Sequence, residues 1–183
     1  IGSGLVGSEM CIRDRSIPEL IRLLMKEGMD FEQSFNIAQH TFSYTNHTVM
    51  GEALEKWPLD LLRSVVPEIV DIILRIDERL KQEAPQLFIV KDNTAHMANL
   101  SIYVGSYVNG VAAIHTEILK NDCFKDWYQV FPQRFQNKTN GVTPRRWMGL
   151  CNPELTQLIK YRVGGDFLKD MDKLSLIHIS EPT

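Results

Sequence analysis

The stretch LDLLRSVVPEIVDIILRIDERL, Leu59 to Leu80, has the clearest periodic pattern in this chain of 183 residues. Its apolar residues recur three and four positions apart, which predicts helix with one buried face. They are Leu59, Leu62, Val65, Val66, Ile69, Ile72, Ile73, Ile76 and Leu80. Pro67 interrupts this stripe, and proline both removes a helical hydrogen bond and clashes with the preceding turn. The sequence therefore predicts two helices, one on each side of Pro67.

Two further helices are expected on the N-terminal side of this stretch. The letters SIPE at residues 16–19 are typical of an N-cap followed by proline in the first helical turn, and Gly28 is typical of a helix end. Apolar spacing predicts the second helix over Phe31 to Gln39. A loop carrying His47 follows, with a short turn over Glu52 to Lys56.

Helices and short strands are expected to alternate on the C-terminal side. We expect one strand over Leu87 to Val90, and a helix, a strand or loop, and a second helix over Met97 to Leu119. Asn140-Gly141 is a turn signal, and Thr143-Pro144 is typical of an N-cap followed by proline. The helix that follows is expected to carry residues 145–147 in its first turn and to end near residue 151. Residues 152–153 begin another, which residues 164–165 stop.

Composition and charge exclude several classes of protein. Apolar residues make up 44% of the chain and charged residues 23%, which is ordinary for a globular domain. A net charge of −3 without a long basic run gives no indication of nucleic-acid or anionic-membrane binding. No window approaches the roughly 18 apolar residues of a membrane span. Three cysteines without paired spacing suit a reducing, cytoplasmic location.

The two ends of the chain differ from its middle. Residues 1–15, IGSGLVGSEMCIRDR, show neither helical nor strand periodicity, and residues 174–183, LSLIHISEPT, break off an amphipathic pattern. Both strings resemble translated sequencing-adapter sequence. We therefore expect both to be artefacts, with residues 1–15 unstructured, and exclude them from the prediction of the fold.

Motifs for metal and phosphate binding are incomplete. His115 and Glu117 match the H-x-E half of a zinc deaminase site, but no P-C-x-x-C follows, so no metal is expected. His115 is instead expected to pack on the inward face of a helix. The glycines at 105 and 110 do not fit a phosphate-binding loop, because Val111 occupies the position of its lysine.

Three loop features remain as candidates for recognition of a ligand: His47, the bend at residues 108–111, and Asn140-Gly141 leading to Trp147. Histidine and asparagine on loops can fix hydrogen-bond directions, as recognition of a sugar hydroxyl requires. Each also has a plainer interpretation. His47 could satisfy loop carbonyls, Asn140 could be a left-handed turn residue, and Trp147 could belong to a core.

Three ordered motifs carry a family resemblance: YTNHTV…EALEKWP at 44–58, VNGVAAIHTEILK at 108–120, and FQNKTNGVTPRRW…CNPEL at 135–155. Together they resemble the glycogen, starch and maltodextrin phosphorylases. The resemblance implies an α/β fold, here a mainly helical fragment of a two-domain, Rossmann-like (GT-B type) glycosyltransferase. Residues 16–141 would be the C-terminal part of the first domain, and residues 142–173 the start of the second, cofactor-binding domain.

The resemblance also implies roles for four residues. His47 and Asn140 match residues that bind the 6-hydroxyl of the glucosyl unit, Val111 matches a residue lining that pocket, and Trp147 matches a tryptophan packed close to pyridoxal 5'-phosphate. The family reaction is reversible phosphorolysis of α-1,4-glucans by inorganic phosphate, giving glucose 1-phosphate, in enzymes that are usually homodimers.

The resemblance further implies an incomplete enzyme. The lysine that attaches the cofactor and the basic cluster that binds phosphate are not matched in this chain, so the fragment should be inactive alone. A non-catalytic glucan-binding or scaffold relic of the same fold is the alternative. A third interpretation is that the isolated piece is unstable, with Leu62, Ile69, Ile73 and Ile76 exposed.

Overall fold

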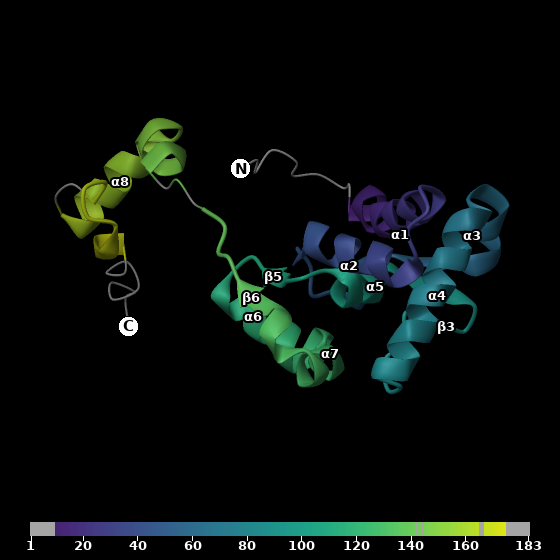
Figure 1. Cartoon of the computed structure of the whole chain (residues 1–183). Coiled ribbons are helices and arrows are strands. Elements are labelled where there is room, and N and C mark those ends of the chain that lie inside the picture. Colours follow the sequence, from purple (N-terminus) through teal and green to yellow (C-terminus); the bar gives the residue numbers. More distant parts are fainter. Residues whose placement is uncertain (1–9, 142, 144, 165–166, 175–183) are drawn as a thin grey trace. The chain divides into compact units, whose positions relative to one another are not determined.

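The computed structural model describes residues 10–141, 143, 145–164 and 167–174 (Figure 1). The predictions for residues 1–9 and 175–183, Pro144 and Gly165 lie outside these residues. The chain divides into two compact units between Thr139 and Asn140. This division is close to the expected domain boundary after residue 141. The assignment of the two parts to different phosphorylase domains stays a prediction.

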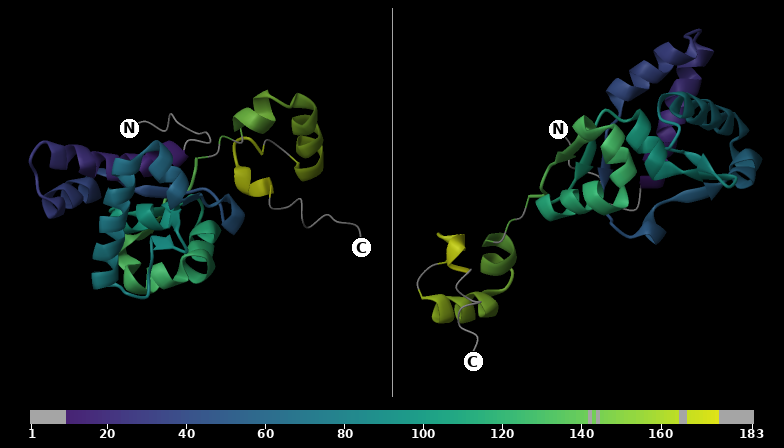
Figure 2. Two further views of the ribbon diagram at one scale, coloured as in Figure 1. Left: turned by 90° about the vertical axis from the view of Figure 1, so that its right-hand side faces the viewer. Right: turned by 90° about the horizontal axis from the view of Figure 1, so that it is seen from below.

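The first unit contains most of the helices. The longer ones are α1 (Met10–Lys26), α2 (Phe31–Thr41), α3 (Leu59–Val65), α4 (Pro67–Glu83), α5 (Met97–Val104), α6 (Ala113–Ile118) and α7 (Lys125–Val130). Three single-turn helices are η1 (Gly51–Ala53), the π-helix η2 (Leu119–Cys123) and η3 (Pro132–Arg134). Helices α1 and α2 lie side by side, and α1 also packs on α4 and α5 (Figure 2).

Two small sheets complete the first unit. The strands are β1 (Tyr44–Asn46), β2 (Lys56–Pro58), β3 (Val90–Lys91), β4 (Thr94–His96), β5 (Val108–Gly110) and β6 (Phe135–Asn137). One sheet is parallel with the order β1-β5-β6, and the other is antiparallel with the order β2-β4-β3. The described chain is therefore mainly helical α/β, as expected.

Helix α1 begins earlier than predicted. It includes residues 10–15, so the N-cap expected at Ser16 is wrong, and so is the expectation that all of residues 1–15 are unstructured. Pro18 lies inside the helix. Tertiary contact overrides the local signal, because the carboxylate of Asp14 is buried and accepts a hydrogen bond from Ser101 Oγ on α5 at 2.8 Å. The predicted end is confirmed by Gly28, which has a φ of +97°.

The break at Pro67 is confirmed. Helix α3 ends at Val65, and α4 begins at Pro67, where a proline in the first turn leaves no helical donor unpaired. Most of the stripe is buried in one core, so the interpretation that Leu62, Ile73 and Ile76 lie exposed is wrong for the described structure. Val65 is the exception, with 70% of its surface exposed at the helix end.

The strand expected over Leu87 to Val90 is only partly correct. Leu87 and Ile89 are buried, but strand pairing starts at Val90 and continues through a turn at Asp92-Asn93, both with positive φ. The reason is that a side chain, and not a neighbouring strand, accepts the backbone hydrogen bonds of this segment. Oδ1 of Asp77 on α4 accepts hydrogen bonds from the backbone N–H groups of Ile89 at 2.7 Å and Val90 at 2.9 Å.

The other helix predictions agree with the structure. Helix α2 begins with a capping box between Asp30 and Gln33. The Met97 to Leu119 region forms α5, β5 and α6, as expected.

Among the described residues, no helix is long and apolar enough to cross a membrane.

The second unit contains a π-helix, η4 (Arg145–Leu150), which packs on α8 (Pro153–Val163). The Asn152 side chain caps α8 by accepting from Leu155 N at 3.1 Å, and Gly164 follows the helix with a φ of +71°. Both predicted helices are thus present. The buried residues described here are few: Thr156, Ile159 and Phe167.

Candidate functional site

The parallel sheet brings two predicted site residues to the same edge. In its register, the last residues of the three strands, Asn46, Gly110 and Asn137, lie opposite one another. His47 follows β1 directly and Val111 follows β5 directly. Ligands of α/β proteins bind outside the carboxyl ends of parallel strands, so this edge is the candidate site.

A turn built by Asn46 fixes the backbone around His47. The side chain of Asn46 is fully buried, and its Oδ1 accepts a hydrogen bond from the N–H of Thr48 at 2.8 Å. Its Nδ2 donates to the hydroxyl of Tyr44 at 3.1 Å. His47 lies at the apex of this Asx turn and is exposed. Its ring makes no hydrogen bond to another described residue, which disfavours the interpretation that it satisfies loop carbonyls.

The imidazole of His115 connects this turn to the loop after β5. Nδ1 of His115 accepts a hydrogen bond from the backbone N–H of Val111 at 3.1 Å. Nε2 lies 3.1 Å from Oδ1 of Asn46. The expectation that His115 only packs on a helix is therefore wrong, because both ring nitrogens have polar partners at the sheet edge.

Gly110 allows α6 to approach this edge closely. A Cβ atom at Gly110 would lie 2.9 Å from Cα of Thr116 and closer still to its hydroxyl. Thr116 Oγ1 donates to the carbonyl of Ala112 at 2.9 Å and lies 3.0 Å from the amide of Asn137 on β6. With the amide of Asn137 oriented so that its nitrogen donates, it also reaches the carbonyls of Gly110 and Ala112.

Burial sets the electrostatics around β1. Desolvation raises the pKa of Tyr44 to about 12, partly offset by its hydrogen bond with Asn46. Tyr44 thus stays a neutral hydroxyl that can accept from Asn46. Desolvation also raises the pKa of Asp14 to about 7, against the opposing hydrogen bond from Ser101. These two groups face a small hollow of about 150 Å³ beside β1.

The remaining two predicted site residues lie in the second unit. Asn140 is exposed, and the described non-glycine residues with positive φ are Asp92 and Asn93, so Asn140 is not a left-handed turn residue. Trp147 lies on η4 with 66% of its surface exposed, which is incompatible with a core role within this unit. Beside it on η4, Arg145 Nε donates to the carbonyl of Leu168 at 2.5 Å.

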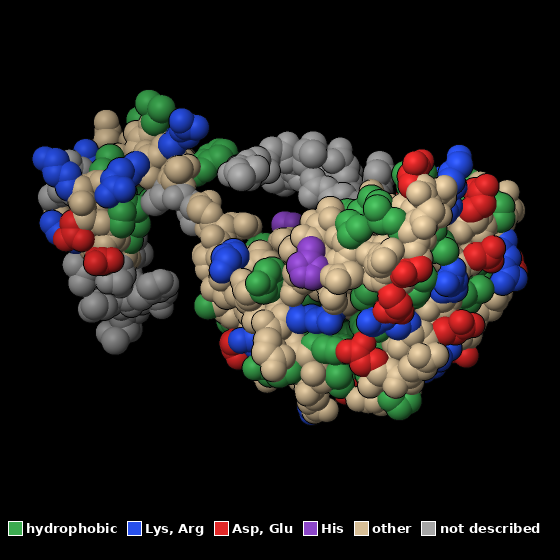
Figure 3. Space-filling view, viewed as in Figure 1, with side chains coloured by type: hydrophobic (Ala, Val, Ile, Leu, Met, Phe, Trp, Pro, Cys, Tyr) green, Lys and Arg blue, Asp and Glu red, His purple; other side chains and the backbone are tan. Residues whose placement is uncertain are grey.

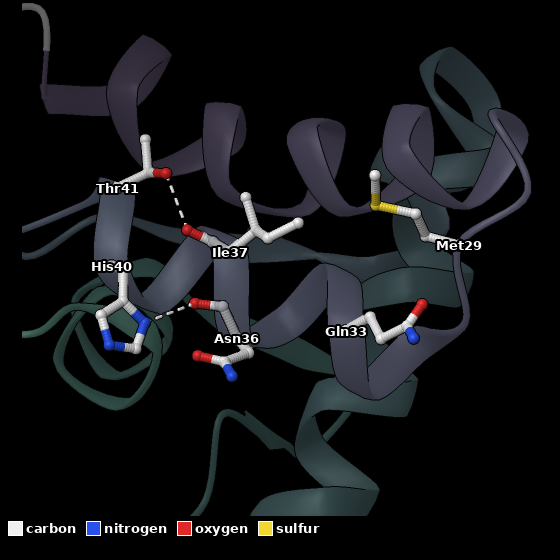
Figure 4. Close-up of a pocket in the computed structure, with 6 residues that line it drawn as sticks. All are labelled: Met29, Gln33, Asn36, Ile37, His40 and Thr41. Atoms are coloured by element: carbon white, nitrogen blue, oxygen red, sulfur yellow. Dashed lines mark hydrogen bonds between the residues drawn. The ribbon is translucent and has the colours of Figure 1, made fainter.

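A larger hollow on the first unit does not contain the predicted residues. It encloses about 570 Å³ and is lined by residues of α2 and the turn before it, namely Met29, Gln33, Asn36, Ile37, His40 and Thr41 (Figure 4). His40 and Thr41 bond to carbonyls of their own helix, Asn36 O at 2.8 Å and Ile37 O at 2.7 Å. These polar groups already have hydrogen-bond partners within α2, and the hollow is a shallow surface depression, so we assign it no ligand.

The face of the first unit drawn in Figure 3 shows acidic and basic side chains interspersed, without a large patch of one sign. Within the described part of the chain, no group of three or more His, Cys, Asp or Glu residues is arranged to hold a metal ion.

Comparison with known proteins identifies the family. The family model for carbohydrate phosphorylases matches residues 14–181, so the chain belongs to this family. Human muscle glycogen phosphorylase is 44% identical over 174 residues, covering 87% of this chain. Maltodextrin phosphorylase of Streptococcus pneumoniae is 46% identical over 161 residues, covering 86% of it. The chain spans 21% of the length of each of these relatives.

The match bears on the ends of the chain as well. It starts at Asp14 and reaches residue 181, so it includes part of each stretch that resembles adapter sequence. The origin of these two stretches stays a prediction.

Sequence reasoning named His47 and Val111 but not the groups that hold them. Two signals were available. Asn46 and Thr48 flank His47 in the spacing of an Asx turn. His115 follows Val111 by four positions, which places its ring within reach of the Val111 N–H at a helix start.

Proposed function

We propose that the intact protein containing this chain is an α-1,4-glucan phosphorylase, which uses inorganic phosphate to release glucose 1-phosphate from the ends of glycogen or maltodextrin. Family membership supports the reaction class. The structural observation that carries the proposal is the sheet edge, where His47 and Val111 follow adjacent parallel strands. The fold of the intact protein would be the two-domain GT-B type.

In this proposal His47, Val111 and Asn140 bind the glucosyl unit. His47 can donate to or accept from a sugar hydroxyl, because its ring is exposed and its backbone is held by the Asn46 turn. Asn140 offers an exposed amide with both a donor and an acceptor. Val111 contributes an apolar wall beside a backbone N–H already paired with His115. These groups position the sugar and do not break its bond.

Trp147 is the residue proposed to contact pyridoxal 5'-phosphate. Its exposed indole suits this, since an uncovered aromatic face can pack against a planar ring. The cofactor, when bound, supplies a phosphate group for proton transfer to the attacking inorganic phosphate. Its attachment lysine and the basic phosphate-binding cluster are proposed to lie outside this chain, which would be inactive alone. The intact enzyme is proposed to be a cytoplasmic homodimer.

Substitution of the proposed sugar ligands tests the function. In the intact enzyme, His47→Ala or Asn140→Ala should lower kcat/KM for maltodextrin by roughly one to three orders of magnitude, at about 1.4 kcal/mol per order. Loss of a hydrogen bond that orients the substrate is the physical reason. The measurement is phosphorolysis with inorganic phosphate, monitored as glucose 1-phosphate release.

His40→Ala is a matched control, because His40 is an exposed histidine on α2 that bonds to its own helix. It should leave kcat/KM within about twofold of the wild type. Unchanged kinetics in both ligand variants would remove the sugar-binding assignment. Glucan binding without any phosphorolysis by the intact wild-type protein would favour the binding relic.

A further inference from the structure

In the polar network at the sheet edge, His115 has two directed hydrogen bonds that the proposed sugar ligands do not explain. The ring lies between two loops that follow neighbouring strands. It reaches Asn46 across 69 positions of sequence and Val111 on the loop just before its own helix, α6. A residue that only filled space would not need either bond.

The two bonds fix the tautomer of His115. The N–H of Val111 can only donate, so Nδ1 must be the unprotonated acceptor. The ring proton is then on Nε2, which donates to Oδ1 of Asn46. The neutral ring thus has one arrangement that satisfies both partners, and it fixes the direction of the whole network.

Asn46 passes this restraint to His47. Its Oδ1 accepts from both His115 Nε2 and the N–H of Thr48, and its Nδ2 donates to Tyr44. Every bond of this buried amide therefore points in a set direction, and the Asx turn carrying His47 depends on it. Removal of the imidazole would take away one of the three bonds that orient the amide and leave the N–H of Val111 without its partner.

We propose that His115 is a positioning residue for the sugar site, which holds the His47 turn and the Val111 backbone in a single arrangement. The inference deepens the proposed function and rests on it. His115 is not proposed to touch substrate. It acts through Asn46 on one side and through the main chain of Val111 on the other.

Two conservative variants separate the two bonds. The amide oxygen of Asn can take the place of Nδ1, and the amide nitrogen of Gln can take the place of Nε2. His115→Asn should therefore keep the bond to Val111, and His115→Gln the bond to Asn46. His115→Ala should lose both.

Nuclear magnetic resonance of the 183-residue chain tests the geometry without any activity. We expect the amide signals of Thr48 and Val111 both to shift in His115→Ala, that of Thr48 to shift more in His115→Asn, and that of Val111 more in His115→Gln. In the wild-type chain, long-range ¹H–¹⁵N correlation spectra of the His115 ring should show the proton on Nε2. A proton on Nδ1, or unmoved signals in His115→Ala, would overturn the proposal.

A double-mutant cycle in the intact enzyme tests the consequence for function. His115→Ala should lower kcat/KM for maltodextrin by about 10- to 100-fold, and because part of this effect passes through His47, the loss in the double variant should be clearly smaller than the product of the two single losses. Leu119→Ala is the control, because Leu119 is fully buried one turn beyond His115 and its apolar side chain makes no hydrogen bond in the network. It should lower the melting temperature but leave kcat/KM within about twofold.

The outcomes are distinguishable. Fully additive losses for His47 and His115, or an equal loss in Leu119→Ala, would reduce His115 to a structural residue. Absence of phosphorolysis in the wild type would reject the proposed function, while the resonance experiment would still decide whether His115 holds the two loops.

Discussion

At the scale of single residues, Asp77 shows how one buried carboxylate replaces regular secondary structure. It is 2% exposed, and its Oδ1 accepts from the N–H groups of Ile89 and Val90. Its Oδ2 pairs with Lys81 one turn along α4 at 2.5 Å. Burial of a charge is tolerated because several donors surround it. Asp77 therefore joins α4 to the segment that leads into the antiparallel sheet.

Asp77→Ala should lower the free energy of unfolding by about 2–3 kcal/mol, because it leaves backbone donors unpaired in the interior. Asp77→Asn keeps an oxygen for both N–H groups and loses only the ion pair with the half-exposed Lys81, so its cost should be about 1 kcal/mol or less. Urea unfolding of the 183-residue chain measures both. Asp71→Ala, at an exposed position of α4, serves as the control. Equal losses for the alanine and asparagine variants would contradict this account.

At the scale of elements, β5 and α6 approach each other closely at Gly110. The backbone of Gly110 lies against Thr116, and no room remains for a Cβ atom. The close approach is what places His115, one residue before Thr116, over the ends of β1 and β5. Gly110 is thus required by packing, and no positive φ is involved.

Gly110→Ala should destabilise the chain by about 2–3 kcal/mol, because the added methyl group meets backbone atoms that cannot move independently. Gly51→Ala is the matched control, since its Cβ would have no neighbour within 4 Å. The comparison of urea midpoints should show a clear loss for the first variant and little change for the second. Similar midpoints for the two would mean that α6 can retreat from the sheet without cost.

The sequence predicted helices better than strands, because helix starts and breaks depend largely on local chemistry and strand pairing depends on distant residues. The break at Pro67 and the cap at Asn152 depend on local chemistry, so both could be located in advance. The start of α1 depends on a contact between Asp14 and Ser101, 87 positions apart, which no local pattern encodes. Strand β3 was misplaced for the same reason, because Asp77 accepts the hydrogen bonds of the Ile89 and Val90 N–H groups.

The candidate site shows the same contrast between local signals, which can be predicted, and contacts between distant residues, which cannot. His47 and Val111 could be named from motifs, but their shared edge appears only when β1 pairs with β5 across the intervening helices. The bond between His115 and Asn46 could not be predicted, since Asn46 is remote in sequence, whereas the bond to Val111 had a local signal in the four-position spacing. The structure therefore adds to the sequence the strand pairing and the hydrogen bonds between distant segments.

At the scale of the whole molecule, the two units differ in how much apolar surface they bury. The large core cluster of buried residues lies in the first unit, whereas the buried apolar residues described in the second are Ile159 and Phe167. Exposed apolar residues of the second unit include Trp147, Leu150, Leu155, Leu158 and Tyr161. Because hydrophobic burial is the main stabilising contribution to folding, the two units should not be equally stable.

We therefore expect the first unit to unfold cooperatively while the second exchanges its amide protons readily. Trp127 is 5% exposed and reports on the first unit when Trp57 and Trp147 are replaced by phenylalanine. Its fluorescence should show one sharp urea transition with a slope of about 1–3 kcal/mol per molar urea. Under native conditions, hydrogen exchange should be slow in α4 and much faster in α8. A gradual Trp127 transition would support the unstable-fragment interpretation, and equal protection of α4 and α8 would show that the second unit gains stability from contacts beyond its own small core.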